Sequence, residues 1–246
     1  MRGVLTYHSL DASGSAISVD PGDFDRQMKW LSSSGVRVVP LTAILDPGEG
    51  DRVALTFDDG FSNFEESALP ILRDYDFPAT VFVVSRHVGA TNSWPGSAAS
   101  TRIPTLSLMD WHGVWRIAVA GIEIGAHSQT HPDLRRMPKS QLNSEIEGCR
   151  DDITRELGVA PRSFCYPYGE VSDTVRNAVA DASFTFAVTT ELRAIDSELV
   201  DSRLIPRIDM YYFREPGGLE SWGSPAFTRR LLMRRAARRV RSMVRN

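Results

Sequence analysis

The sequence predicts an α/β fold, a distorted (β/α) barrel of about seven parallel strands. Short apolar, β-branched runs alternate with helical patterns from end to end, and there are enough of these runs to close a barrel. A chain of 246 residues, 42% of them hydrophobic, suits one domain of that size. An open doubly wound sheet is the alternative, because periodicity does not separate the two. The strands are expected at Val4–Tyr7, Val36–Val39, Val53–Phe57, Ala79–Val84, Ile122–Ala126, Ser163–Tyr166, Phe184–Val188 and Leu204–Ile208.

Helical patterns fill the intervals between these runs. One follows the start signal Asp20-Pro21, and another starts near Leu106 with Asp110 in its first turn. No domain boundary stands out before residue 216, so we expect one barrel domain over residues 1–215 and a basic helical tail over residues 216–246. A third helix is expected from an apolar stripe at steps of three and four residues, formed by Leu142, Ile146, Cys149, Ile153 and Leu157.

Charge is unevenly distributed along the chain. The net charge is −3, but residues 226–246 hold eight arginines and no acidic residue, so the rest of the chain carries about −11. An acidic body argues against nucleic acid as a partner. No run approaches the ~20 apolar residues of a membrane span and no signal-peptide pattern opens the chain, which predicts a cytoplasmic protein. Nothing in the sequence indicates an oligomeric state.

Polar residues follow three of the expected strands at their carboxyl ends, which form the catalytic face of such barrels. The first of these strands leads into Asp58-Asp59-Gly60. Adjacent carboxylates repel each other unless a cation or a proton separates their roles. Successive strand residues point to opposite sides, so a bend at Gly60 must help both carboxylates reach one site. An ordinary Asp-Gly turn is the alternative for this segment taken alone.

The second polar segment is His-Ser-Gln-Thr-His at residues 127–131, and the third is Cys-Tyr-Pro-Tyr-Gly at residues 165–169. Two histidines four residues apart suit a divalent metal, with a structural pair as the alternative. The aromatic residues and constrained backbone of the third segment suit the lining of a pocket. Taken together, one aspartate and two histidines provide three metal ligands and leave open positions, while the other aspartate is free to take a proton from water.

These segments resemble motifs of the polysaccharide deacetylase family, also called the NodB-homology or carbohydrate esterase 4 family. Thr-Phe-Asp-Asp-Gly at residues 56–60 is similar to its first motif and residues 127–131 are similar to its second. The resemblance, which spans about residues 4–210, implies a NodB-like barrel that removes N-acetyl groups from glycans. It also implies a general base at Asp58, metal ligands at Asp59, His127 and His131, and an oxyanion contact from the backbone N–H of Tyr168.

Two features of the family's pattern are missing. Cys165 stands where the third motif usually has an arginine that holds the base, and no histidine follows the second motif to serve as general acid. His8 would fill the place of the acid if its strand closes the barrel beside the first motif, with a buried structural histidine as the alternative. Arg207 would replace the arginine from another strand end, with Arg203 or a surface salt bridge as alternatives. The Tyr-His start also resembles a subgroup linked to exopolysaccharide biosynthesis.

The predicted function is removal of N-acetyl groups from the amino sugars of a glycan or saccharide precursor, by a hydrolase with a metal-bound water as nucleophile. Zinc is the expected ion, although two histidines and one aspartate also accommodate cobalt, nickel or iron. Trp94, in a loop rich in small residues, would either stack on a sugar ring or anchor that loop. The alternative functions are hydrolysis of a non-sugar amide, such as a formamide or cyclic ureide, and glycan binding without catalysis.

The arginine-rich tail has apolar residues at helical spacing over residues 226–245. A basic amphipathic helix of this kind can lie on an anionic membrane, which would suit an enzyme at the inner membrane face. In the alternative, its apolar face packs on the barrel and its arginines pair with the acidic body.

Overall fold

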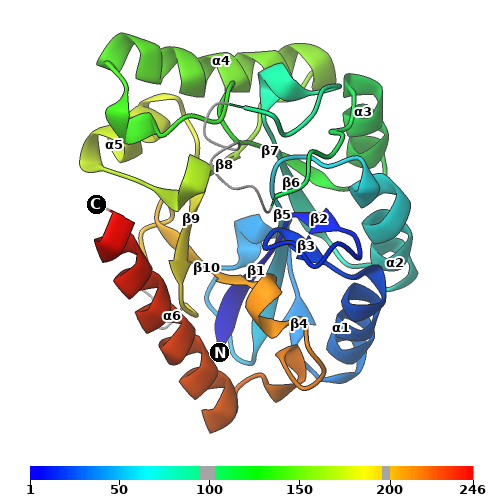
Figure 1. The fold of residues 1–246 in the computed structure, drawn as a ribbon. Coiled ribbons are helices and arrows are strands. Elements are labelled where there is room, and N and C mark those ends of the chain that lie inside the picture. The colour runs from blue at the N-terminus through cyan, green and yellow to red at the C-terminus, as the bar shows by residue number, and fades with distance from the viewer. Residues whose placement is uncertain (95–102, 196–199, 246) are drawn as a thin grey trace.

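The computed structural model describes residues 1–94, 103–195 and 200–245, with side chains described as far as residue 238. Seven parallel strands close into a barrel that is surrounded by helices (Figure 1). Because β1 pairs with β5 along its whole length, the sheet is closed and the predicted distorted (β/α) barrel is confirmed. The order around the barrel is β1 (Arg2–Tyr7), β10 (Ile205–Asp209), β9 (Phe186–Leu192), β8 (Ser163–Cys165), β7 (Glu123–Ala126), β6 (Ala79–Val83) and β5 (Arg52–Phe57).

Three shorter strands lie outside this ring. β4 (Arg37–Val38) pairs with the beginning of β5, and β2 (Ser9–Leu10) pairs with β3 (Ser18–Val19) in a separate small sheet. The strand expected from Phe184 begins only at Phe186 and runs on to Leu192. Phe184 instead packs in the core, where its ring centroid lies 5.2 Å from that of Phe164.

The helices follow the strands in sequence and cover the outside of the barrel (Figure 1). The helix expected from Leu106 starts at Trp111, because Asp110 is its N-cap and accepts a hydrogen bond from Gly113 N at 2.7 Å. The described helices are α1 (Pro21–Ser33), α2 (Leu69–Asp74), α3 (Trp111–Val119), α4 (Lys139–Leu157), α5 (Asp173–Asp181) and α6 (Pro225–Arg245).

Alternation along the strands divides the side chains between two environments. Tyr7 and Phe57 point outward from paired positions of β1 and β5, with stacked rings 5.2 Å apart, and pack against Phe24 of α1. Thr6 and Thr56, one residue earlier on the same two strands, therefore face the barrel interior. The outward set forms the main core against the helices, and the inward set leads toward the carboxyl ends of the strands.

Helix α6 lies alongside β9, at the left of the barrel in Figure 1. Phe227 and Leu231 are buried against the barrel, whereas Leu232 and Met233 are 57% and 59% exposed. Arg235 forms an ion pair of 2.6 Å with Glu191 of β9. The first half of the tail thus packs on the barrel and pairs with its acids. None of the described helices combines the length and the apolar character needed to span a bilayer.

Candidate active site

The carboxyl ends of the barrel strands bring together most of the polar residues singled out by the sequence. Asp58 and Asp59 follow β5, His127 follows β7, and Arg207 lies within β10. His8 follows β1, the strand that pairs with both β5 and β10. All of these side chains except that of His8 are buried.

The turn after β5 allows the adjacent carboxylates to face one site. Asp59 has a φ of 71° and Gly60 a φ of 75°, both in the left-handed region. A Cβ at position 60 would also lie 3.2 Å from Val83 Cγ1, so glycine suits this position for space as well as for conformation. Left-handed backbone is costly for a non-glycine residue and tends to occur at functional sites. Ser128, His131 and Tyr168 share it, with φ values of 62°, 59° and 58°.

Arg207 holds Asp58 in a two-point contact. Its Nη1 donates to Asp58 Oδ1 and its Nη2 to Asp58 Oδ2, each at 2.7 Å, and the two side chains are only 1% and 3% exposed. Burial disfavours the ionised carboxyl, but the guanidinium outweighs it and holds the pKa of Asp58 well below its usual range. Asp58 is therefore a fixed, ionised carboxylate at the centre of the site.

Asp59 forms a second group with the two histidines of the second motif. Its Oδ1 lies 3.6 Å from His127 Nε2 and 3.8 Å from His131 Nε2, and one ligand atom from each residue lies within 4.8 Å of the other two. His127 Nδ1 donates to the backbone carbonyl of Cys165 at 2.7 Å, which leaves the lone pair on Nε2 facing Asp59. The structure thus brings the three expected ligands together around one point.

The charge states of this group fit a divalent cation. Burial lowers the pKa of His127 to about 4 and that of His131 well below its usual value, so both rings are neutral, as metal ligands must be. Burial raises the pKa of Asp59 to about 7, whereas Arg207 keeps its neighbour Asp58 ionised. A bound cation would compensate the buried charge of Asp59. One carboxylate and two neutral imidazoles form a donor set suited to zinc.

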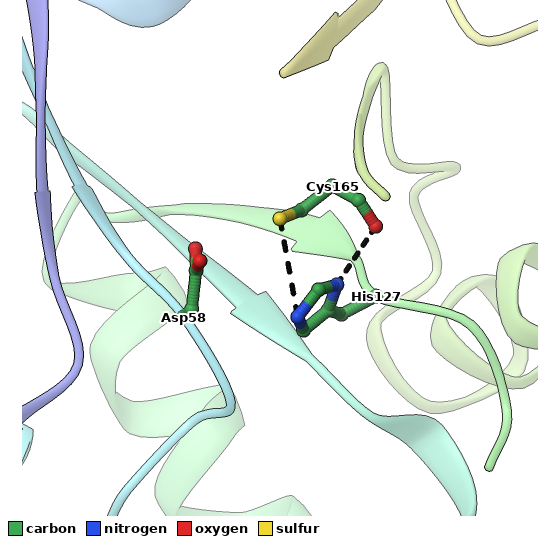
Figure 2. A group of neighbouring side chains, drawn as sticks. All are labelled: Asp58, His127 and Cys165. Carbon is green, nitrogen blue, oxygen red and sulfur yellow. Dashed lines mark hydrogen bonds between the residues drawn. The ribbon is translucent and has the colours of Figure 1, made fainter. Parts of the chain in front are cut away.

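A second cluster, Asp58, His127 and Cys165, is also close enough to be considered as a metal site (Figure 2). Both oxygens of Asp58 are already bound by Arg207, whose Nη2 also lies 3.2 Å from Cys165 Sγ. Burial raises the pKa of the Cys165 thiol well above its usual value, and a thiol must lose its proton to bind metal. A guanidinium at this position repels a second cation, so Asp59, His127 and His131 are the better ligand set.

Helix α4 holds the loop that carries the two histidines. Glu145 is buried and accepts hydrogen bonds from the backbone N of Thr130 at 2.8 Å and from Thr130 Oγ1 at 2.7 Å. Two turns further along, Asp152 accepts from Gln129 Nε2 at 2.9 Å. Sequence reasoning missed both acids, because a charged residue on an amphipathic helix ordinarily indicates a solvated face.

Removing the Glu145 carboxylate is expected to weaken metal binding. Glu145→Ala removes both hydrogen bonds that hold the half-buried Thr130 and frees the strained loop between the two histidines. We expect zinc affinity, measured by competition with a chelator, to fall about tenfold or more. Glu147→Ala, on the exposed face of the same helix, is the control. Wild-type affinity in Glu145→Ala would show that the loop holds its shape without α4.

The third motif forms the wall beside His131. The ring of Tyr168 lies 4.6 Å from that of His131, and its carbonyl accepts from Thr190 Oγ1 at 3.1 Å. Gly169, with a φ of 71°, lies so close to Thr190 that a Cβ would be 2.4 Å from its backbone N, which explains the glycine. Tyr168 is half-exposed, as expected for a residue lining a pocket.

The remaining expectations differ in outcome. His8 faces the site, with Nε2 at 3.7 Å from Asp58 Oδ2, and is 25% exposed, so it is not a buried structural histidine. Trp94 is 5% exposed, and its ring lies 4.5 Å from that of His131. Stacking of Trp94 on a sugar ring is not favoured by this position, because so little of the indole is accessible. The other interpretation, an anchor of the loop, fits the contact better.

Comparison with known proteins identifies the family to which the chain belongs. A family model described as polysaccharide deacetylase matches residues 46–187, more than half of the chain, and the match includes the two motifs that provide Asp58, Asp59, His127 and His131. The chain belongs to the polysaccharide deacetylase family.

Similar sequences and folds are found among bacterial deacetylases. YxkH of Bacillus subtilis (strain 168), a putative polysaccharide deacetylase by name, is 25% identical over 195 residues, covering 76% of this chain and 64% of YxkH. A poly-β-1,6-N-acetyl-D-glucosamine N-deacetylase of Staphylococcus aureus (strain N315) is 25% identical over 197 residues, covering 78% of this chain and 67% of that protein. The chain thus spans about two thirds of the length of these relatives. IcaB from Ammonifex degensii shares the fold, with a TM-score of 0.73, 22% identity, and coverage of 90% of this chain and 97% of IcaB.

The structure gives a physical reason for one departure from the family's motifs. The short side chain of Cys165, where an arginine is usual, leaves space for the guanidinium of Arg207 to reach Asp58 from β10. This polysaccharide deacetylase therefore places an arginine on the first aspartate of its first motif from a different strand.

Proposed function

We propose that this chain is a metal-dependent N-deacetylase that acts on the N-acetylated amino sugars of a glycan. The observation that carries the proposal is the division of roles between adjacent carboxylates. Asp58 is kept ionised by Arg207, while Asp59 turns to two neutral histidines. A pair of titratable groups whose pKa values are driven apart by their surroundings is the arrangement expected of an acid–base site.

Each residue has a role in amide hydrolysis. When bound by Asp59, His127 and His131, a divalent ion, with zinc as the first choice, would polarise the amide oxygen and lower the pKa of water. Asp58 accepts the proton of the attacking water, and Arg207 fixes the direction of its carboxylate. The backbone N–H of Tyr168 donates to the developing oxyanion. His8, whose Nε2 lies 3.7 Å from Asp58 Oδ2, protonates the leaving nitrogen.

Asp58 also favours a catalytic protein over one that only binds glycans. A glycan-binding relative needs no second carboxylate beside a metal group, and burying the Asp58–Arg207 pair carries a large desolvation cost. Such a cost is understandable if the ionised carboxylate takes part in a reaction. The non-sugar amide alternative has no comparable observation in its favour.

The names of the relatives guide the choice of substrate. A β-1,6-linked oligomer of N-acetylglucosamine is the first candidate, because the Staphylococcus aureus relative is named for that polymer. We expect the protein to release acetate from this oligomer, faster than from β-1,4-linked oligomers, and to stop when EDTA is added. Release of product only from a formamide or a cyclic ureide would overturn the sugar assignment. Turnover that EDTA does not affect would overturn the metal dependence.

We also propose that residues 1–215 form the deacetylase barrel and that the tail binds anionic membrane from the cytoplasmic side. The exposed Leu232 and Met233 give α6 an apolar edge beyond the face that packs on the barrel. Arginines not engaged by the barrel would contribute about 1 kcal/mol each near an anionic surface.

Vesicle cosedimentation tests the membrane proposal. We expect salt-sensitive binding of the full chain to vesicles containing anionic lipid, and none to neutral vesicles. Binding should fall in the double variant Leu232→Ser/Met233→Ser but persist in Trp115→Ser, a change at an exposed apolar residue on α3. Absence of binding at low salt would assign the tail a purely structural role.

A further inference from the structure

A small cavity lies beside His8. Its volume is about 20 Å³, enough for a single water molecule. Every lining side chain has a polar atom, and four elements, β1, β9, β10 and α6, contribute to the wall, together with His8, which follows β1. The lining residues are Thr6, His8, Thr190, Arg207, Asp209 and Arg238.

Thr6 indicates what the cavity holds. Its side chain is 4% exposed, and its Oγ1 has no hydrogen-bond partner among the described residues. A buried hydroxyl without a partner is costly, and in folded proteins such groups are usually satisfied by ordered water. Thr6 lies opposite Asp209 in the β1–β10 pairing, so the hydroxyl and the carboxylate face the same space.

Asp209 is the acidic residue that lines the cavity. Its Oδ1 accepts from the backbone N of Tyr211 at 3.1 Å, and its Oδ2 lies 4.0 Å from Arg238 Nη1. That second separation is too long for a direct hydrogen bond and suits a bridging water. Arg238 belongs to α6, so the C-terminal helix supplies the outer wall of this cavity.

We propose that the cavity binds one ordered water that positions His8, and that Arg238 of α6 keeps this water from exchanging freely with solvent. His8 Nε2 is turned to Asp58, at 3.7 Å from Oδ2, which leaves Nδ1 for the water. The water accepts the hydrogen of Nδ1, donates to the carboxylate of Asp209, and satisfies Thr6 Oγ1. This bridge fixes the direction of the imidazole ring and keeps Nε2 facing Asp58.

The inference rests on the proposed function, in which His8 is the general acid, and it adds two positioning residues and a water site. It also gives α6 a part in the reaction, through Arg238. Thr6 and Asp209 touch neither substrate nor metal, so their effect should appear in kcat rather than in KM or in metal content.

Four variants, one of them a control, test the proposal by structure and by kinetics. Thr6→Val keeps the branched shape and removes the hydroxyl, and Thr6→Ser restores it. We expect kcat for acetate release to fall about tenfold in Thr6→Val with KM unchanged, and to recover in Thr6→Ser, because loss of one hydrogen bond of this kind is worth about that factor. Arg238→Ala should lower kcat by a similar factor. Arg234→Ala, on the same helix but stacked on Tyr212, should not.

Crystal structures at high resolution provide a readout that does not depend on activity. The wild type should show one water within hydrogen-bond distance of Thr6 Oγ1 and Asp209, and Thr6→Val should lose it. Wild-type crystals with no such water would overturn the site, and wild-type kcat in both Thr6→Val and Arg238→Ala would overturn its role. A wild-type protein that releases no acetate from any glycan would overturn the proposed function and the role of His8, while the density would still decide whether the cavity binds water.

Discussion

Asp58→Asn is expected to reduce acetate release by about 10²-fold or more while the protein keeps its metal. The asparagine has nearly the same shape but cannot accept the proton of the attacking water. Both oxygens of Asp58 are bound by Arg207 and neither is needed by the Asp59 group, so the metal content should stay near the wild-type value. Steady-state kinetics and metal analysis of the same preparations measure the two quantities.

The control for this variant is its stability. The Asp58→Asn change would leave the buried guanidinium of Arg207 without its counter-charge, and breaking a buried pair from one side costs about 3–5 kcal/mol. Thermal unfolding must therefore show that the variant is folded at the assay temperature. If metal and activity are lost in equal proportion from a folded variant, Asp58 is a ligand rather than the base.

His131→Ala is expected to abolish activity by a different route, through loss of the metal. Asp59, His127 and His131 each offer one ligand atom to the metal, so the substitution removes one of three protein ligands. We expect bound zinc to fall below the detection limit at micromolar protein, and added zinc to restore little activity. His112→Ala provides the matched control, because this exposed histidine lies on α3, away from the site. Full zinc content in His131→Ala would remove His131 from the ligand set.

The sequence predicted the barrel and the main polar segments because both depend on local patterns. Apolar runs alternating with helices require a parallel sheet, and polar residues that end parallel strands must meet at one edge. Asp58, Asp59 and His127 each follow such a run closely, so their proximity follows from topology. The sequence leaves the role of Arg207 open, because it does not show which of the two nearby arginines, Arg203 or Arg207, points into the barrel.

Other features of the site depend on contacts between distant segments, and these were missed. Glu145 lies on an amphipathic helix, and only the packing of α4 against the loop of the second motif shows that its carboxylate is buried. For Trp94 the sequence leaves two roles open, because composition does not show how deeply a loop residue is buried. The pairing of the α6 arginines with Glu191 and Asp209 likewise requires the tail to be placed on the barrel.

The metal site itself can be tested by anomalous diffraction from crystals of the zinc-loaded protein. We predict one zinc peak at about 2.0–2.2 Å from a carboxylate oxygen of Asp59, from His127 Nε2 and from one ring nitrogen of His131. Asp58 should remain on Arg207, outside the coordination shell. A peak bound by Asp58 and Cys165, or a zinc-loaded active protein with no peak between Asp59 and the two histidines, would contradict the proposed division of roles.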